Sequence, residues 1–258
     1  ANYLSSTDGV TVVGQPSTRV AWLQFNTING DSPVNDLKVR QALNYAIDRD
    51  SLIAGVLDGY AVKVASISTP EYNDYDASVQ GYTYDPEKAK SLLAEAGYAD
   101  GFTVDLSVSP GMLNATDVAQ AVASQLAEVG VTVNIQQEDS ATQRDKIMSG
   151  TVAPIFLNSL GGPYCDIELI ASIGFTKGGR YCTWDSDEFG DLASRAAAAV
   201  DDTERAQLHS EMQQFMVDQA PAVWLYQQDT LYAYNSAKVQ NWTARTDEVV
   251  LMDGVSVQ

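Results

Sequence analysis

The chain has 258 residues, of which 45% are hydrophobic and 19% charged, a balance typical of globular domains and not of disordered, collagenous or coiled-coil chains. Its 34 acidic and 15 basic residues give a formal net charge of −19, which disfavours binding to nucleic acids and to anionic lipids. No apolar stretch approaches the ~20 residues that a membrane-spanning helix needs. The N-terminus lacks the basic region and apolar run of a signal peptide, which predicts either a cytoplasmic chain or a mature or excised piece of a longer protein.

The first third of the chain predicts a strand, two helices and a long irregular segment. Residues 20–25 favour an extended conformation. Apolar residues recur at helical spacing over 39–47, with Asp36 as a helix cap, and a second short helix is expected over 49–57. The segment 59–84 has no periodicity and holds six tyrosine or proline residues, so we expect an irregular excursion held in place by aromatic side chains.

The middle of the chain carries the clearest signals. A helix is expected over 85–97, because an aspartate-proline pair starts it and a glycine ends it in a left-handed conformation. Apolar residues then alternate over 102–108, recur at helical spacing over 118–129 and alternate again over 131–135. This order predicts a βαβ unit, in which two parallel strands are joined by a right-handed crossover.

The remainder of the chain predicts six further elements. In chain order they are a short helix at 144–148, a strand at 152–157, helices at 189–199 and 208–216, and strands at 222–226 and 231–234. Together with the βαβ unit, these elements predict an α/β fold in which helices flank a mixed sheet.

The residues do not point to an enzyme. Nucleophilic catalysis by serine or cysteine needs a neighbouring base, and His209 is the single histidine of the chain. Its position in the expected helix 208–216 predicts a solvent-facing side chain. The sequence has no Gly-x-Ser-x-Gly elbow and no glycine-rich phosphate loop with lysine. Pairs of carboxylates are frequent in so acidic a chain and carry little information, so no catalytic residue, metal ligand or cofactor is assigned.

Two loops are better placed to bind a ligand. In open parallel α/β sheets, ligands lie beyond the carboxyl ends of the strands. The loop 109–114 follows the strand that ends at Val108, and the loop 158–166 follows the strand that ends at Leu157. Both loops are rich in Gly, Pro, Asn and Ser, which expose backbone donors and acceptors. Topology alone is equally compatible with plain connections at both places.

Cys165 and Cys182 are the two cysteines, with 16 residues between them. A zinc site needs four ligands, and one histidine does not complete the set. The pair therefore indicates either two buried thiols or one disulfide in an oxidising compartment.

Four segments carry a distinctive pattern. They are Phe25-Asn26-Thr27 with residues 36–49, residues 84–98, residues 125–131, and residues 201–205 with 220–226. In order and spacing, over roughly residues 20–242, they resemble family 5 of the extracytoplasmic solute-binding proteins of ABC importers, which carry peptides, nickel complexes and other solutes.

The resemblance implies a fold, a place and a function. The fold would be one lobe of a type II periplasmic-binding-protein-like structure. The protein would lie outside the cytoplasm, either periplasmic or lipid-anchored at the cell surface. As a monomer, without cofactor, metal or nucleic acid, it would capture a peptide or other small polar solute between two lobes and deliver it to ABC permease subunits in the membrane.

Members of that family are about twice as long as this chain. The resemblance therefore implies that residues 20–238 form the C-terminal α/β lobe, and that 1–19 and 239–258 adjoin a first lobe absent here. An extracytoplasmic setting also favours a disulfide between Cys165 and Cys182, worth about 3 kcal/mol for a loop of this length.

The resemblance places both glycine-rich loops at the cleft between the lobes, as the topology does. The candidate ligand-binding residues are Ser109, Gly111, Asn114, Asn158, Gly161, Gly162, Tyr164 and Asp166. Members that bind dipeptides anchor the ligand carboxylate with an arginine in the loop that matches 109–114, and this chain has none there. Asp166 has two alternative roles, pairing with a ligand cation or capping a helix that begins at Ile167.

The main hypothesis is therefore a non-enzymatic substrate-binding lobe. A secreted hydrolase-like domain that uses paired carboxylates and a sensor domain without a transport role are the alternatives.

Overall fold

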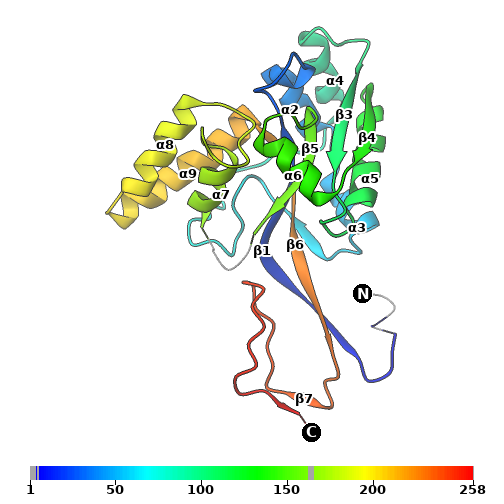
Figure 1. Ribbon diagram of the computed structural model, residues 1–258, viewed down its shortest axis with the longest axis vertical. Helices are drawn as coiled ribbons and strands as arrows, with labels where there is room; N and C mark the ends of the chain where they lie inside the picture. Colours follow the sequence, from blue (N-terminus) through cyan, green and yellow to red (C-terminus); the bar gives the residue numbers. More distant parts are fainter. Residues whose placement is uncertain (1–3, 5, 162–165, 258) are drawn as a thin grey trace.

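The structure is a computed structural model that describes residues 4, 6–161 and 166–257. A mixed sheet carries helices on both faces, and a long two-stranded ribbon extends from it (Figure 1). The elements are β1 (Thr11–Phe25), η1 (Pro33–Asn35), α2 (Leu37–Tyr45), α3 (Arg49–Val56), β2 (Ala61–Lys63), α4 (Pro86–Glu95), β3 (Phe102–Val108), α5 (Ala115–Ala127), β4 (Val131–Gln137), α6 (Ser140–Met148), β5 (Ile155–Leu160), α7 (Ile167–Gly174), α8 (Asp187–Ala198), α9 (Asp202–Gln219), β6 (Ala222–Tyr234), β7 (Val239–Gln240) and β8 (Ser256–Val257). None of the described helices combines the length and apolar character needed to cross a membrane.

The main sheet has the strand order β2-β6-β1-β5-β3-β4. β3 pairs in parallel with β4 and with β5, and α5 connects β3 to β4, so the predicted βαβ unit is confirmed. The pairs β1–β5, β1–β6 and β2–β6 are antiparallel. The predicted α/β fold with a mixed sheet is therefore confirmed.

Acidic side chains start most of the helices. Six described helices have an N-cap aspartate that accepts a hydrogen bond from a backbone amide of the first turn: Asp36, Asp48, Asp85, Asp139, Asp166 and Asp201. Such caps satisfy amides that have no partner within the helix. The predicted stop at Gly97 is also confirmed, because this residue has a φ of 90°.

Several elements differ from the sequence-based predictions. β5 ends at Leu160 instead of Leu157, because β1 pairs with it as far as that residue, so Asn158 lies in the strand and not in the loop. α6 begins at Ser140 instead of near 144, because Asp139 caps its first turn. β6 is one continuous strand instead of two, because β1 pairs with it from Ala222 to Tyr234. The short strand β2 lies in the segment expected to be irregular, and it pairs with the edge of β6.

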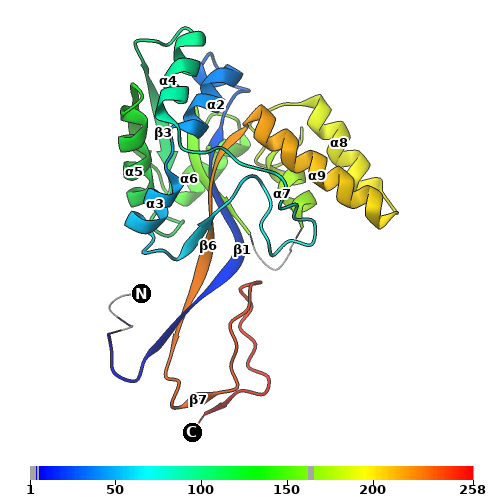
Figure 2. The same ribbon diagram turned by 180° about the vertical axis from the view of Figure 1, so that it is seen from behind.

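Side-chain alternation along β1 divides the core between the two faces of the sheet. Ala21, Leu23 and Phe25 belong to the core cluster that packs under α2, α3, α4 and α5. Val20 and Trp22 belong to the opposite cluster, which includes residues of α7, α8 and α9 (Figures 1 and 2). Because successive side chains of a strand point to opposite faces, one strand serves both cores.

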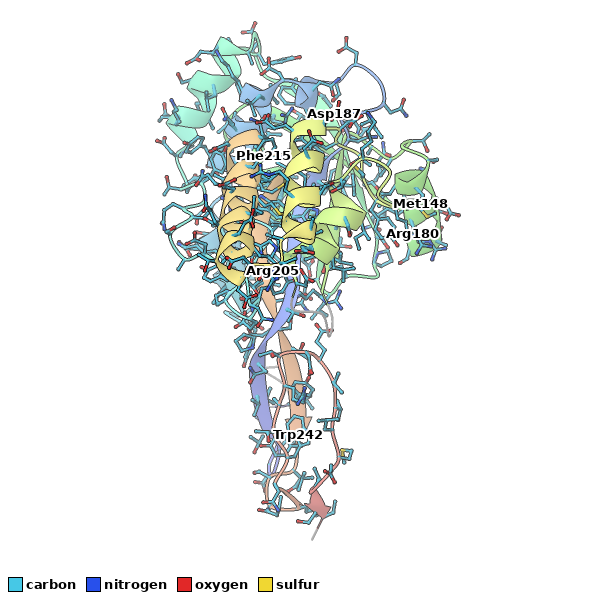
Figure 3. The ribbon with its side chains drawn as sticks, turned by 90° about the vertical axis from the view of Figure 1, so that its left-hand side faces the viewer. Met148, Arg180, Asp187, Arg205, Phe215 and Trp242 are labelled. Carbon is cyan, nitrogen blue, oxygen red and sulfur yellow. The ribbon has the colours of Figure 1, made fainter. Side chains whose placement is uncertain are left out.

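Aromatic rings dominate the second core. Trp22 on β1 lies opposite Trp224 on β6, with ring centroids 5.6 Å apart, and Phe175 packs on both rings at 6.0 and 5.4 Å. α8 and α9 run side by side over this face (Figure 3), with Phe189 and Phe215 in contact at 5.7 Å. These contacts attach the α7–α9 layer to β1 and β6.

The ribbon is the part of the β1–β6 ladder that lies beyond the sheet. It continues to the pair Thr11 and Tyr234, and β7 and β8 pair with each other at this far end. The segment between β7 and β8 rises beside the ribbon and descends again (Figure 1). Trp242 anchors this segment by packing against the rings of Tyr232 and Tyr234, at 5.0 and 5.1 Å. The tail also exposes an apolar run, Val249 to Met252, whose four side chains are 39–62% exposed.

Two arginines of the 36–49 segment are buried and bind backbone carbonyls. Arg49 donates hydrogen bonds to the carbonyl oxygens of Trp224, Asn44 and Ile47, at 2.6, 3.1 and 3.2 Å. Burial lowers the pKa of Arg49 to about 10. Arg40 donates in the same way to the carbonyls of Gln219 and Ala220, which end α9. The guanidinium groups therefore hold α2 and α3 against β6 and the C-terminus of α9.

Replacing Arg49 by Met should lower the free energy of unfolding by about 3 kcal/mol, because buried carbonyls lose their donor. Chemical denaturation of the isolated chain measures the change. The matched control is Arg195→Met on the exposed face of α8, which should change stability by less than about 0.5 kcal/mol. Equal effects of the two substitutions would contradict the structural role of Arg49.

The end of β5 approaches β1 closely. Leu160 pairs with Val20, and the next residue, Gly161, lies against the backbone of Arg19. A Cβ atom on Gly161 would lie 2.4 Å from the Cα of Arg19, which is closer than atoms can pack. Only glycine fits at this position without moving one of the two strands.

Gly161→Ala should therefore destabilise the chain by about 1–3 kcal/mol, because the substitution forces the two backbones apart. Gly174→Ala at the end of α7 is the matched control, since a Cβ there meets nothing within 4 Å. That control should be neutral or slightly stabilising. Thermal unfolding of both variants measures the difference, and a neutral Gly161→Ala would show that the close approach is absent in solution.

Candidate functional site

The carboxyl ends of β3 and β5 open on a groove beside the point where the ribbon leaves the sheet. Two adjoining cavities, of about 450 and 210 Å³, share the residues Ser140, Gln143, Asn158 and Ser159. The remaining lining residues are Arg19, Ser109, Gly111, Met112, Leu113, Leu157 and Gln228 in the larger cavity, and Trp22, Arg144, Ile147, Leu160, Gly174 and Tyr181 in the smaller one. We call this site the β3–β5 groove.

Hydroxyl groups line the β3 side of the groove. Ser109 Oγ and Ser140 Oγ are 2.7 Å apart, and the Gly111 amide donates to Ser109 Oγ at 3.3 Å. Ser159 Oγ is buried and has no hydrogen-bond partner among the described residues. A buried hydroxyl without a partner costs free energy, which a polar ligand in the groove would recover.

Hydrogen bonds to Gln24 and to the Ser159 backbone fix the side-chain amide of Asn158. Its Nδ2 donates to Gln24 Oε1 at 3.1 Å, and its Oδ1 accepts from the Ser159 amide at 2.9 Å. Gln24 is fully buried, and its own amide nitrogen donates to the carbonyls of Gly174 and Tyr181. The polar atoms of Asn158 are thereby fixed in orientation at the floor of the groove.

Asn114 does not line the groove in the described structure. It is the N-cap residue of α5, in the left-handed conformation with φ of 56°, and its Nδ2 donates to the Val56 carbonyl at 3.2 Å. Gly161 adjoins the groove through its contact with Arg19. Gly162, Tyr164 and Cys165 lie outside the described residues.

Asp166 lies at a different cavity. Its Oδ1 accepts a hydrogen bond from the Glu168 amide at 2.7 Å as the N-cap of α7, so the capping role is confirmed. It lines a separate cavity of about 360 Å³ together with Asn73, Asp74, Ala197, Ala199, Glu168, Arg205 and His209. The structure therefore brings Ser109, Gly111 and Asn158 together, but not Asp166.

The prediction that His209 faces solvent was wrong, because the side chain is 2% exposed. Nε2 lies 2.9 Å from Glu168 Oε1, and Nδ1 lies 3.0 Å from Asp74 Oδ1 without a well-aligned hydrogen bond. The irregular segment before α4 covers this face of α9, as the bond from Gln213 Nε2 to the Asp74 carbonyl shows. Helical periodicity marks apolar faces only, so it missed a polar face buried by a loop.

The expected disulfide is not supported. Cys182 is a free cysteine whose Sγ donates to the Trp184 carbonyl at 2.9 Å, and burial raises the pKa of its thiol. The expectation rested on the family's compartment and on spacing along the chain. Neither fixes the short Cα–Cα separation and orientation that a disulfide requires.

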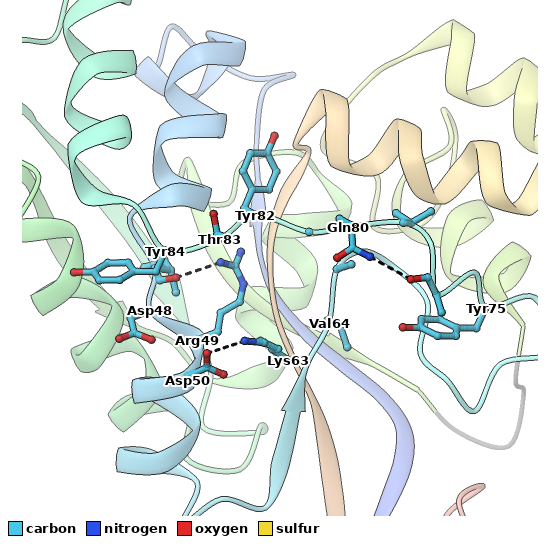
Figure 4. Close-up of a pocket in the computed structure, with 15 residues that line it drawn as sticks. Asp48, Arg49, Asp50, Lys63, Val64, Tyr75, Gln80, Tyr82, Thr83 and Tyr84 are labelled. Atoms are coloured by element: carbon cyan, nitrogen blue, oxygen red, sulfur yellow. Dashed lines mark hydrogen bonds and ion pairs between the residues drawn. The ribbon is translucent and has the colours of Figure 1, made fainter.

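A further cavity of about 510 Å³ lies at the β2 edge of the sheet (Figure 4). Its charged side chains are engaged locally: Lys63 pairs with Asp50 at 2.7 Å, Asp48 caps α3, and Arg49 binds backbone carbonyls. No group of three or more potential metal ligands gathers anywhere in the described ranges. The β3–β5 groove remains the best candidate site.

Sequence reasoning missed several lining residues of the groove. Arg19, Ser140, Gln143 and Arg144 come from β1 and α6, outside the two predicted loops. α6 follows β4 directly and starts beside the end of β3, where Glu138 N bonds to the Val108 carbonyl at 2.9 Å. The predicted βαβ unit could have located the α6 residues. Because β3 and β4 are parallel, the helix that follows β4 must start at the same edge of the sheet as the loop that follows β3.

Comparison with known proteins gives a consistent assignment. Residues 1–179 match the family described as "Bacterial extracellular solute-binding proteins, family 5 Middle". The dipeptide-binding protein of Escherichia coli is 32% identical over 222 residues, covering 83% of this chain and 41% of that protein. Heme-binding protein A of Haemophilus influenzae is 33% identical over 219 residues, covering 82% of this chain and 40% of that protein. The chain thus spans about two fifths of these relatives.

Solved structures share the fold over the whole chain. A putative peptide-binding protein, AppA, from Clostridium difficile superposes with a TM-score of 0.88 at 21% identity, covering 100% of this chain and 54% of that one. NikA from Brucella suis in complex with Fe(III)-EDTA gives 0.87 at 20% identity, with 100% and 54% covered. The fold is that of type II periplasmic binding proteins. On the family match and the identity to its relatives, the chain belongs to family 5 of the bacterial extracellular solute-binding proteins.

Proposed function

We propose that this chain is the C-terminal ligand-binding lobe of an ABC-importer substrate-binding protein, and that it captures a peptide or other small polar solute. The β3–β5 groove carries the proposal, because it is a concave site at the carboxyl ends of the strands and is lined mainly by polar groups. Family membership supports the same role. The relatives named for dipeptide and heme binding, with the glutathione-binding protein GsiB at 37% identity over 147 residues, support a small solute.

The solute would contact hydroxyls, one amide and exposed backbone. Ser109, Gly111 and Asn158 supply these groups in the described structure, and Ser159 offers an unpartnered hydroxyl. Gly162 and Tyr164 remain proposed ligand residues on the loop that follows β5. Asn114 and Gly161 would not contact the solute directly. Each would instead fix the position of the loop to which it belongs.

The ribbon supports a two-lobe protein. We infer that residues 20–238 form this lobe, and that 1–19 and 239–258 adjoin a first lobe. The inference uses the long β1–β6 ladder beyond the sheet, the exposed apolar run Val249 to Met252 in the tail, and the relatives of about twice the length. The solute would lie between the lobes, and the closed protein would deliver it to permease subunits from outside the cytoplasm, without chemical conversion.

The first test compares affinities. The isolated chain should fold, yet bind the solute at least about hundredfold more weakly than the full-length protein, since one lobe leaves much of a small ligand in water and each 1.4 kcal/mol is a factor of ten. The solute is identified by mass spectrometry after native purification, and calorimetry gives both affinities. Equal affinities would contradict the two-lobe site, and a full-length protein without any solute would contradict the function.

The second test concerns Asp166. Since asparagine also caps helices well, Asp166→Asn should leave the unfolding temperature of the full-length protein nearly unchanged. Because Asp166 faces a cavity separate from the groove, the affinity should change by less than about twofold, or ~0.4 kcal/mol. A large loss of affinity with intact stability would instead show that Asp166 belongs to the ligand site and pairs with a cationic group of the solute.

A further inference from the structure

The charge of the β3–β5 groove is opposite to that of the chain. Acidic residues outnumber basic ones 34 to 15 over the whole sequence. The described lining of the two cavities nevertheless includes two arginines, Arg19 and Arg144, and no aspartate or glutamate. A cleft lined by one sign of charge concentrates ions of the opposite sign. The groove is therefore suited to an anion, although the rest of the protein is strongly negative.

Arg19 already holds a carboxylate in this structure. Its Nε and Nη2 donate to the two oxygens of Glu248, at 3.3 and 3.1 Å, in the two-pronged geometry that guanidinium groups form with any carboxylate. Glu248 comes from the tail that returns along the ribbon and adopts a left-handed backbone conformation with φ of 61°. Arg19 and Glu248 remain partly accessible, with side-chain exposures of 33% and 26%. A solute carboxylate can therefore replace Glu248 without opening the core.

Arg144 lies on α6 at the second cavity. Its nearest carboxylate is that of the adjacent Asp145, at 3.7 Å, which is an ion-pair contact beyond hydrogen-bond range. The acids that precede α6 are engaged elsewhere: Glu138 pairs with Lys146, and Asp139 caps the helix. Arg144 therefore has one long, solvent-exposed ion pair and no hydrogen-bonded carboxylate among the described residues, so its donor groups are available to a ligand.

We propose that the solute is an anion with at least two acidic groups, held by Arg19 in one cavity and by Arg144 in the other. Glu248 acts as an internal competitor that occupies Arg19 until the solute displaces it. Ser109, Asn158 and Ser159 bind the neutral part of the solute between the two arginines. This inference rests on the proposed solute-binding function and narrows its substrate class to acidic peptides or similar polyanionic small molecules.

The test uses the full-length protein and three dipeptides of similar size: Glu-Glu, Gln-Gln and Lys-Lys. Calorimetry should give an affinity for Glu-Glu at least about tenfold above that for its neutral isostere Gln-Gln, and weaker binding still for Lys-Lys. Native mass spectrometry of a mixed dipeptide library should show the same enrichment of Asp- and Glu-containing members.

Variants then assign the preference to the named residues. Arg19→Gln and Arg144→Gln should each reduce the Glu-Glu preference about tenfold, and Glu248→Gln should raise the Glu-Glu affinity severalfold because the competitor is removed. Arg195→Gln on α8 and Glu211→Gln on α9 make the same changes in net charge at exposed sites away from the groove, and should leave all three affinities unchanged.

Two outcomes overturn the inference while leaving the proposed function intact. One is preferential binding of Gln-Gln, Lys-Lys or neutral library members, and the other is an acidic preference that survives both arginine substitutions. Binding of no dipeptide and no library member, with no solute retained on native purification, would contradict the proposed function itself, and the inference would fall with it.

Discussion

The antiparallel ladder between β1 and β6 is the constraint on which the rest of the molecule depends. It joins Thr11–Phe25 near the start of the chain to Ala222–Tyr234 near its end. Its inner half supplies two adjacent strands of the sheet, and Trp22 and Trp224 face each other across it in the second core. Forming this ladder closes a loop of about 200 residues, so its entropy cost must be offset by the burial of both hydrophobic cores at once. The buried guanidinium of Arg49 bonds directly to the Trp224 carbonyl and secures the helices to the same strand.

The same ladder also determines the shape of the site. Because β1 pairs with β5 on its other edge, Arg19 comes to lie beside Gly161 at the carboxyl end of β5. β3 pairs with β5 in parallel, so the loop that begins at Ser109 opens at that edge too. The groove is therefore the meeting point of three loops or strand ends that are far apart in sequence, and the ribbon that carries the chain out of the lobe borders it through Gln228.

Local rules predicted the parts of the fold that short-range interactions determine. Aspartate caps and alternating apolar residues located α4 and the β3–α5–β4 unit, because each depends on neighbours within a few residues. Local rules failed where a segment distant in sequence determines the burial of a residue or the length of a strand. His209 is buried by a loop more than a hundred residues earlier in the chain, and β6 is continuous because β1 extends beside it. For the site, strand ends predicted Ser109, Gly111 and Asn158, whereas Arg19 requires the β1–β5 register, which no local pattern contains.

The position of Arg19 would allow a lobe with so negative a surface to bind the anion proposed above. Long-range repulsion from the remaining carboxylates falls off within roughly 10 Å at moderate ionic strength, whereas a two-pronged contact at about 3 Å in a concave site is screened far less. The Glu248 carboxylate shows that this contact forms despite the net charge of −19. Since the pair is partly exposed, its net contribution to stability is small, so exchanging Glu248 for a solute carboxylate replaces one such bond by another at little cost. The preference for a solute over Glu248 would then come from Arg144 and from the fixed amide of Asn158. Glu248 bonds to Arg19 and has no described contact with either of them.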